Sequence, residues 1–215
     1  MRIRSEGWRM DKTKPRRAPG RPRGGEQAAS MRDTVLDAAS LMFMEFGYEP
    51  VSINQIAEKA GVTKASVYYY FSNKAQLFTE AITGMMGRIC GFTTRILTQE
   101  GSLRTRLERV ARAKMASTHV EFESMMREAL HFLSKEQQEQ IRRAEHGIHQ
   151  VLADYFERAI AAKEIASPLS PMVLAHSFAA LLMLGNREDD LSGETAGEDL
   201  SKLIVDLFWN GVGTE

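Results

Sequence analysis

The sequence contains a single cysteine, Cys90, so no internal disulfide can hold the chain together. A chain of 215 residues buries enough surface to fold without such a staple, and a lone thiol is typical of a reducing compartment. The longest uninterrupted apolar run, Phe178 to Leu184, is far too short to cross a bilayer. No apolar stretch follows the basic residues near the N-terminus, so no secretory signal is expected. These absences predict a cytoplasmic protein with no membrane segment.

The chain also lacks any overall charge, because its 28 basic and 28 acidic residues balance. The balance hides an asymmetry. Residues 1–25 hold nine Lys or Arg against Glu6 and Asp11, a net charge of +7, whereas residues 26–80 and 81–215 are mildly acidic. A basic arm on an acidic body favours a polyanionic partner, nucleic acid first and a membrane surface second.

Proline is scarce, with six residues in all and none between Val51 and Ser167. Apolar residues there recur at helical spacing and no strand-like alternation is sustained, which predicts an all-α fold of about nine helices. Capping signals place helix starts after the following residues: Ser52 with Gln55, Thr63, Ser72 or Asn73, Ser134 with Gln137, Ser170 before Pro171, and Thr195 with Glu198. The helices are expected over about 27–46, 53–61, 64–70, 73 into the 90s, 102–119, up to 133, 135–164, 171–187 and 196–209.

The first of these segments should present one apolar face and end at Gly47. The residues expected on that face are Val35, Ala39, Met42, Phe43 and Phe46.

Residues 52–74 predict a helix-turn-helix, in which the second helix enters the major groove of DNA. The small side chain of Ala57 lets two short helices approach each other, and Gly61 is expected to form the turn between them. The wedge is filled by apolar side chains: Ile56, Ala60, Val62 and Val67. Two surface helices that merely meet at a glycine are the alternative.

A longer run of the pattern IA..AGV.K...Y.YF..K..L begins inside this unit. It is formed by Ile56, Ala57, Ala60, Gly61, Val62, Lys64, Tyr68, Tyr70, Phe71, Lys74 and Leu77. A preceding helix that ends in Phe46 and Gly47 belongs to the same pattern. Through these residues the sequence resembles the TetR/AcrR family of bacterial transcriptional regulators. The rest of the chain matches that family in helix count alone.

The resemblance implies phosphate contacts at several helix starts. Hydroxyls and helix N-terminal amides at Ser52 and Thr63 would face phosphates, where the positive end of the helix dipole favours an anion. Lys74 would hold another phosphate, and Tyr68 would lie along the DNA backbone.

The resemblance also divides the second helix between DNA and core. Lys64, Ser66 and Tyr69 would face the floor of the groove. Ala65 departs from the glycine usual in the family, and its methyl would either block close approach to a base or contact a thymine methyl. The residues expected in the core are Val62, Val67, Tyr70 and Phe71.

Residues 1–25 are rich in Arg, Gly and Pro and are expected to form a disordered basic arm. Residues 18–23 resemble the Gly-Arg-Pro core of AT-hook peptides, which insert arginine into the minor groove. The alternative is a generic basic tail that adds counterion-release affinity. Under either interpretation the expected DNA contacts are Arg16, Arg17, Arg21 and Arg23.

The resemblance divides the remainder into a DNA-binding domain, residues 26–80, and a domain for ligand sensing and dimerisation, residues 81–215. Thioethers suit a pocket for a small apolar effector, although ordinary core packing is the alternative. The candidate ligand-binding residues are Met86, Phe92, Met115, His119, Phe122, Met126 and Phe132. Gly84, Gly87 and Gly91 would make the fourth helix pliable, or else let it pack closely against the first helix.

The last two helices carry more apolar surface than a terminal hairpin needs for its own packing, although one-sided core burial is the alternative. In the family, the corresponding helices pair across a two-fold axis, so a homodimer is expected. The candidate interface residues are Leu174, Phe178, Leu181, Leu182, Leu203, Leu207 and Phe208.

An enzyme is the main rival hypothesis, but the sequence gives it little support. His146 and His149 could share a metal ion, yet no further ligand sits at matching spacing. Cys90 is either a redox sensor or a buried thiol. No phosphate loop or nucleophile elbow is present.

We therefore expect no cofactor and no metal. The predicted function is a repressor that binds a palindromic operator in double-stranded DNA as a homodimer and is released by an effector. A DNA-architectural or cell-division protein of the same fold is the alternative.

Overall fold

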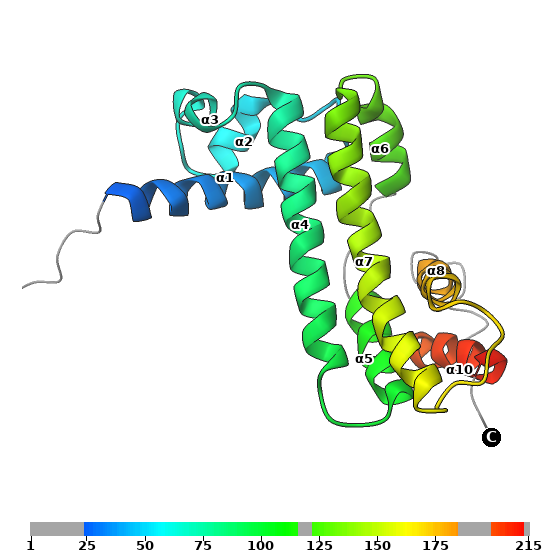
Figure 1. The fold of residues 1–215 in the computed structure, drawn as a ribbon. Coiled ribbons are helices and arrows are strands. Elements are labelled where there is room, and N and C mark those ends of the chain that lie inside the picture. Colours follow the sequence, from blue (N-terminus) through cyan, green and yellow to red (C-terminus); the bar gives the residue numbers. More distant parts are fainter. Residues whose placement is uncertain (1–23, 116–121, 185–198, 213–215) are drawn as a thin grey trace, which may run out of the picture.

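The computed structural model describes residues 24–115, 122–184 and 199–212. Its regular elements are all α-helices, nine in the described residues, arranged as two long central helices with shorter ones at either end (Figure 1). In chain order they are α1 Gly24–Phe46, α2 Ile53–Lys59, α3 Lys64–Tyr70, α4 Lys74–Leu97, α5 Leu103–Met115, α6 Phe122–Leu130, α7 Lys135–Ala161, α8 Pro171–Leu182 and α10 Leu200–Val212. The predicted all-α fold is confirmed.

Capping side chains set most helix starts, as the sequence predicts. Both expected capping boxes form, at Ser52 with Gln55 before α2 and at Ser134 with Gln137 before α7. Single caps also precede α3 at Thr63, α4 at Asn73 and α8 at Ser170. The predicted cap at Thr195 and the predicted helix end at residue 119 lie outside the described residues.

Several helix ends differ from the expectation, including those of α6 at Leu130 and α10 at Val212, which were expected near 133 and 209. Helix α1 begins at Gly24 and so takes in two residues of the predicted arm. Helix α7 ends at Ala161, because Lys163 adopts a positive φ of 61° and turns the chain. The sequence does not predict this end, because lysine is not a residue that typically adopts a positive φ. Helix α8 ends at Leu182, before the predicted end near residue 187.

The helices enclose two apolar clusters. The first joins α1, α2 and α3 to the first half of α4, to α6 and to the start of α7. The second joins the end of α4 to α5, the second half of α7, α8 and α10. Helices α4 and α7 lie side by side and run through both clusters (Figure 1). The predicted domain boundary at residue 80 therefore falls inside one helix, and it stays a prediction.

One expectation and one of two open alternatives about packing are wrong. Phe46 is half exposed, because it lies in the last turn of α1, just before Gly47 redirects the chain with a φ of 84°. Glycines in α4 are not there for close packing against α1. A Cβ added at Gly87 or Gly91 would meet no described atom within 4 Å beyond the helix's own backbone, and at Gly84 it would meet only the Arg88 guanidinium, at 3.8 Å. Pliability of α4 stays a prediction.

None of the helices in the described part of the chain has the length and apolar character needed to cross a membrane.

Candidate nucleic-acid interface

The turn between α2 and α3 depends on one glycine. Gly61 has a φ of 66°, a backbone conformation that residues with a Cβ rarely adopt. The Val62 amide then donates to the Ala57 carbonyl at 2.9 Å, which closes the end of α2. Thr63 follows as the N-cap of α3, and its hydroxyl accepts from the Ser66 amide at 3.1 Å. The sequence thus builds a tight helix-turn-helix at one end of the molecule.

Helix α3 has one buried and one exposed side. Val67 and Phe71 are fully buried against the first cluster, whereas Tyr70 is half buried. On the other side Tyr69 is 81% exposed and Tyr68 is 47% exposed. The expected division of the three consecutive tyrosines between core and surface is therefore borne out by their burial.

The predicted DNA contacts gather around this exposed side. Lys64 and Ala65 are exposed on the first turn of α3, and the Lys64 ammonium lies 5.9 Å from the centroid of the Tyr68 ring. Ser66 is half exposed, and its hydroxyl is 2.9 Å from that of Thr63. Aromatic faces, hydroxyls and an ammonium group are all side-chain chemistry that suits base edges and phosphates.

The Lys74 side chain is bound to other groups of the protein and does not extend freely into solvent. Its ammonium donates to the Glu49 carbonyl at 3.1 Å and lies 4.3 Å from the centroid of the Tyr48 ring. Burial lowers the pKa of Lys74, and the nearby Glu49 carboxylate partly restores it. The predicted phosphate contact of Lys74 would require its ammonium to reach past these two partners.

Ser52, the other residue predicted to bind a phosphate, is exposed at the start of α2 and engaged in its capping box. Arg16, Arg17, Arg21 and Arg23, the predicted contacts of the arm, lie outside the described residues.

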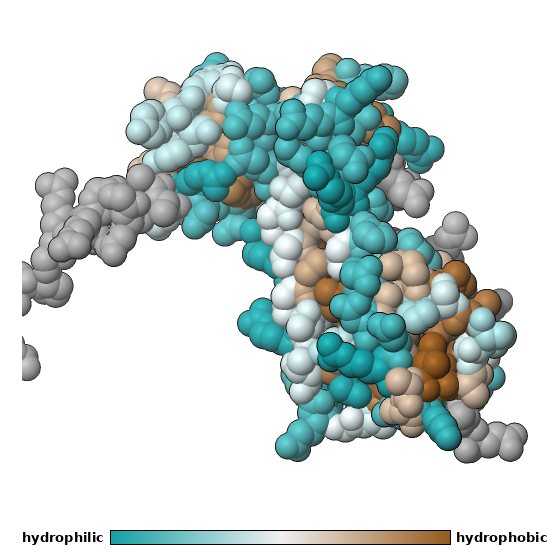
Figure 2. All heavy atoms as spheres, viewed as in Figure 1, coloured by the Kyte–Doolittle hydropathy of each residue, from teal (hydrophilic) through white to brown (hydrophobic). Residues whose placement is uncertain are grey.

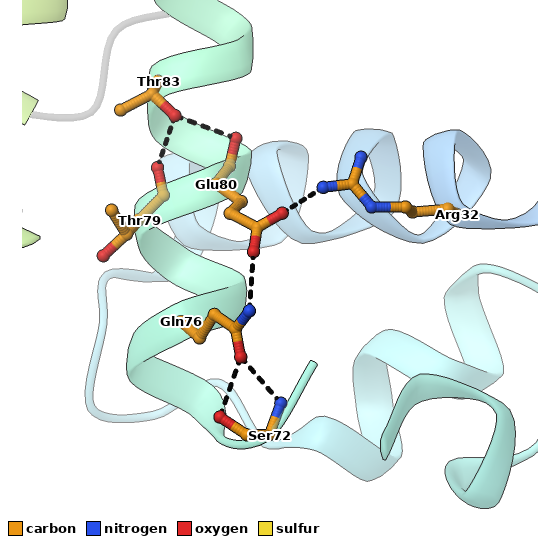
Figure 3. Close-up of polar contacts among 6 residues, drawn as sticks. All are labelled: Arg32, Ser72, Gln76, Thr79, Glu80 and Thr83. Atoms are coloured by element: carbon orange, nitrogen blue, oxygen red, sulfur yellow. Dashed lines mark hydrogen bonds and ion pairs between the residues drawn. The ribbon is translucent and has the colours of Figure 1, made fainter. Parts of the chain in front are cut away.

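A polar network behind α3 was not found by sequence reasoning. Arg32 of α1 forms an ion pair with Glu80 of α4, Glu80 accepts a hydrogen bond from Gln76, and Gln76 accepts two from Ser72 (Figure 3). The spacing of Gln76 and Glu80 on one helix face is a recognisable signal. The pairing of Arg32 with Glu80 leaves no local signal in the sequence.

The candidate effector residues do not line one cavity. Met86 is buried in the first cluster, with Phe122 and Met126 packed against it. Met115 packs against the second cluster, and Phe92 is half exposed.

Two effector candidates stand apart from these. Phe132 is half exposed and lies on the Tyr48 ring, with the ring centroids 5.2 Å apart. His119 lies outside the described residues.

A polar groove of about 420 Å³ lies between the first halves of α4 and α7. It contains none of the predicted effector residues and does not suit an apolar molecule. Its lining residues are Gln76, Thr79, Glu80, Ser134, Glu136, Gln137 and Gln140.

Burial corrects the candidate dimer interface. Leu174, Phe178, Leu182 and Phe208 are buried in the second cluster of the single chain, where aromatic rings of α7, α8 and α10 pack together, so they have no surface to offer a second copy. Three candidates reach the surface to different degrees. Leu181 and Leu203 are half buried, and Leu207 is 60% exposed.

His149 pairs with a histidine other than His146, the residue considered as a second metal ligand. His149 lies against His176 of α8, with ring centroids 4.0 Å apart, whereas His146 is exposed. The Nδ1 atom of His149 is buried without a hydrogen-bond partner. Among the described residues no group of three potential ligands could hold a metal ion. Burial raises the pKa of the Cys90 thiol, so a reactive thiolate is not favoured there.

The helix-turn-helix and its neighbouring helices match a known protein family. Residues 35–81, which span the second half of α1 through the first turns of α4, match the profile of bacterial regulatory proteins of the tetR family. These residues form a domain of the tetR family. The profile covers the helix-turn-helix and parts of the helices that support it, and it leaves out residues 82–215.

Two curated relatives are transcription regulators. The HTH-type transcriptional repressor KstR2 of Mycolicibacterium smegmatis is 32% identical over 80 residues, which cover 37% of this chain and 38% of that protein. The HTH-type transcriptional regulator AcrR of Shigella flexneri is 36% identical over 55 residues, 26% of each chain. The chain thus spans less than two fifths of the length of these two curated relatives.

A solved structure extends the likeness to the whole fold. The reduced form of Escherichia coli NemR superimposes with a TM-score of 0.71 over 86% of this chain and 98% of that one. At 16% identity this likeness supports the fold alone.

Proposed function

We propose that this protein is a DNA-binding transcription regulator that represses by occupying an operator through α3. The exposed side of α3 carries the proposal. Tyr69, the most exposed large aromatic side chain in the described residues, projects from a short helix whose opposite side is fixed in the core by Val67 and Phe71. A rigid helix with an exposed polar and aromatic face at one end of the molecule suits insertion into a major groove.

We extend the proposal to a homodimer on a palindromic operator. A helix-turn-helix protein reads two half-sites about one helical turn or more apart, and this requires two copies. Apolar surface gathers at the end of the molecule that carries α8 and α10 (Figure 2), where Leu207 and Val173 are exposed. A second copy covering this end would leave both α3 helices free.

Release by a small apolar effector completes the proposal. Met86 belongs to the first cluster, and Phe122 and Met126 of α6 pack against that cluster. Thioethers adapt readily to varied apolar shapes. Because α4 begins directly after α3, a ligand that shifts α4 would shift the DNA-reading helix. A coupling of about 1–3 kcal/mol between effector and DNA is expected for such a device.

Genome-wide occupancy and sedimentation test the proposal together. A few promoter sites, bound by a dimer, are the expected result. Broad coverage of AT-rich DNA would instead favour an architectural protein. Sedimentation as single subunits at concentrations that saturate DNA would contradict the homodimer.

A further inference from the structure

Arg32 and Glu80 connect α1 and α4 to the C-terminal end of α3. Arg32 of α1 pairs with one carboxylate oxygen of Glu80, and the other oxygen accepts from the Gln76 amide at 2.9 Å. The Gln76 carbonyl oxygen accepts from the Ser72 amide at 2.8 Å and from the Ser72 hydroxyl at 2.7 Å (Figure 3). A continuous chain of polar contacts thus runs from α1, across the first turns of α4, to the segment that joins α3 to α4.

Arg32 also contacts the end of α3 directly. Its guanidinium carbon lies 5.5 Å from the centroid of the Phe71 ring, and Phe71 is the C-cap of α3. One arginine therefore touches the residue that ends α3 and anchors the network that holds the next residue, Ser72. Because α3 is only seven residues long, its direction is set largely by how its ends are held.

We propose that Arg32 and Glu80 are positioning residues that set the angle of α3 for DNA reading, acting through Gln76, Ser72 and Phe71. The inference rests on the proposed function, since it assigns these residues a part in operator binding. Neither residue needs to touch DNA, because the network fixes the helix that carries Tyr69.

The sign of one substitution separates this role from a direct phosphate contact by Arg32. Glu80→Gln removes a negative charge from a protein that binds a polyanion, so electrostatics alone would strengthen DNA binding. Removing Glu80 would also free Arg32 to bind a phosphate. Positioning predicts the opposite result, weaker operator binding, because both Arg32 and Gln76 lose the group that holds them.

The chain supplies a matched control in a second ion pair between the same two helices. Arg88 of α4 lies 3.2 Å from Asp37 of α1, about two turns further along α4 than Glu80. Asp37→Asn removes the same charge from the same kind of pair. The hydrogen bond described for Arg88 goes to the Ser40 hydroxyl of α1 and not to the end of α3.

The experiment measures dissociation constants of the full chain for a selected operator and for a random-sequence duplex, at several salt concentrations. Arg32→Ala and Glu80→Gln should each weaken operator binding about fivefold, with the salt slope unchanged. The double variant should be no weaker than either single variant, because both break one network. Asp37→Asn should leave operator affinity unchanged or raise it.

The proposal is overturned if Glu80→Gln binds the operator as tightly as Asp37→Asn does. A loss confined to Arg32→Ala, with a salt slope lower by about one charge, would make Arg32 a phosphate contact instead.

Hydrogen exchange of the α3 amides in the free protein gives a readout that needs no DNA. Exchange should be faster in Glu80→Gln than in Asp37→Asn, and equal rates would contradict the positioning role. If the wild-type chain prefers no duplex, the proposed function fails, while the exchange result still reports on the network.

Discussion

Alanine substitutions at two positions on α3, Val67 and Tyr69, should affect different properties of the protein. Val67 is fully buried in the first cluster and Tyr69 is 81% exposed. Val67 therefore stabilises the fold, whereas Tyr69 is proposed to contact DNA. Val67→Ala should therefore lower stability, whereas Tyr69→Ala should lower operator affinity and leave stability nearly unchanged.

The magnitudes follow from burial. Val67→Ala removes two buried methyl groups at about 0.8 kcal/mol each and leaves a small cavity, a loss of about 2 kcal/mol. For a chain of this size that loss lowers Tm by roughly 4–8 °C. Tyr69→Ala should change the free energy of unfolding by less than about 0.5 kcal/mol, since the side chain contacts mostly water. Loss of one base contact should weaken operator binding about tenfold.

Calorimetry and fluorescence anisotropy measure the two effects on the same preparations. Anisotropy is recorded at a temperature well below the Tm of Val67→Ala, so that every sample is folded. At that temperature Val67→Ala should bind the operator within about threefold of wild type, because about 2 kcal/mol leaves most molecules folded. Unchanged operator affinity in Tyr69→Ala would refute the assignment of this face of α3 to DNA.

Three further predictions concern the turn, the histidine pair and the dimer. Gly61→Ala should lower the free energy of unfolding by about 1 kcal/mol, because Gly61 has a positive φ. Gly87→Ala, at an open position inside a helix, should raise the free energy of unfolding by about 0.5–1 kcal/mol. Thermal unfolding of the two variants measures both effects. The pKa of His149 is lowered by burial and by the nearby His176 and His146. The unfolded chain therefore takes up this proton first, so stability should fall as the pH drops below about 6.5, and His149→Asn should reduce that fall. Leu207→Glu should turn a sedimenting dimer into monomers while the fold persists.

Each of these has an outcome that contradicts it. Equal Tm changes in the two glycine variants would show that the Gly61 conformation is not strained by a Cβ. An identical pH dependence of Tm in wild type and His149→Asn would assign the acid sensitivity to other groups. A stable dimer in Leu207→Glu would place the interface away from the exposed side of α10.

The sequence predicted the features that depend on local chemistry. Caps such as Ser52, Thr63 and Ser134 were recognisable, because a short polar side chain before an apolar periodic segment starts a helix. The division of α3 was implied by the resemblance to the TetR/AcrR family, and it agrees with helical periodicity because Val67 and Phe71 lie four residues apart. The candidate DNA contacts of α3 could be named from the sequence through that resemblance alone.

Features that depend on contacts between distant segments could not be predicted. Phe178 and Phe208 are apolar whether they face their own core or a second chain, and the sequence does not say which. Arg32 and Glu80 are 48 positions apart, and in the sequence they resemble ordinary surface charges. Only the packing of α1 against α4 brings them together. The end of α7 depends on a lysine at positive φ, a conformation that packing imposes on the backbone.

Selection of bound sequences from a pool of random duplex DNA tests the central claim most directly, with the wild-type chain and Tyr69→Ala run in parallel. The account predicts that wild type enriches an inverted repeat whose half-sites lie about one helical turn or more apart, and that Tyr69→Ala enriches it weakly or with altered bases. A wild-type pool that stays as random as the starting pool would contradict it.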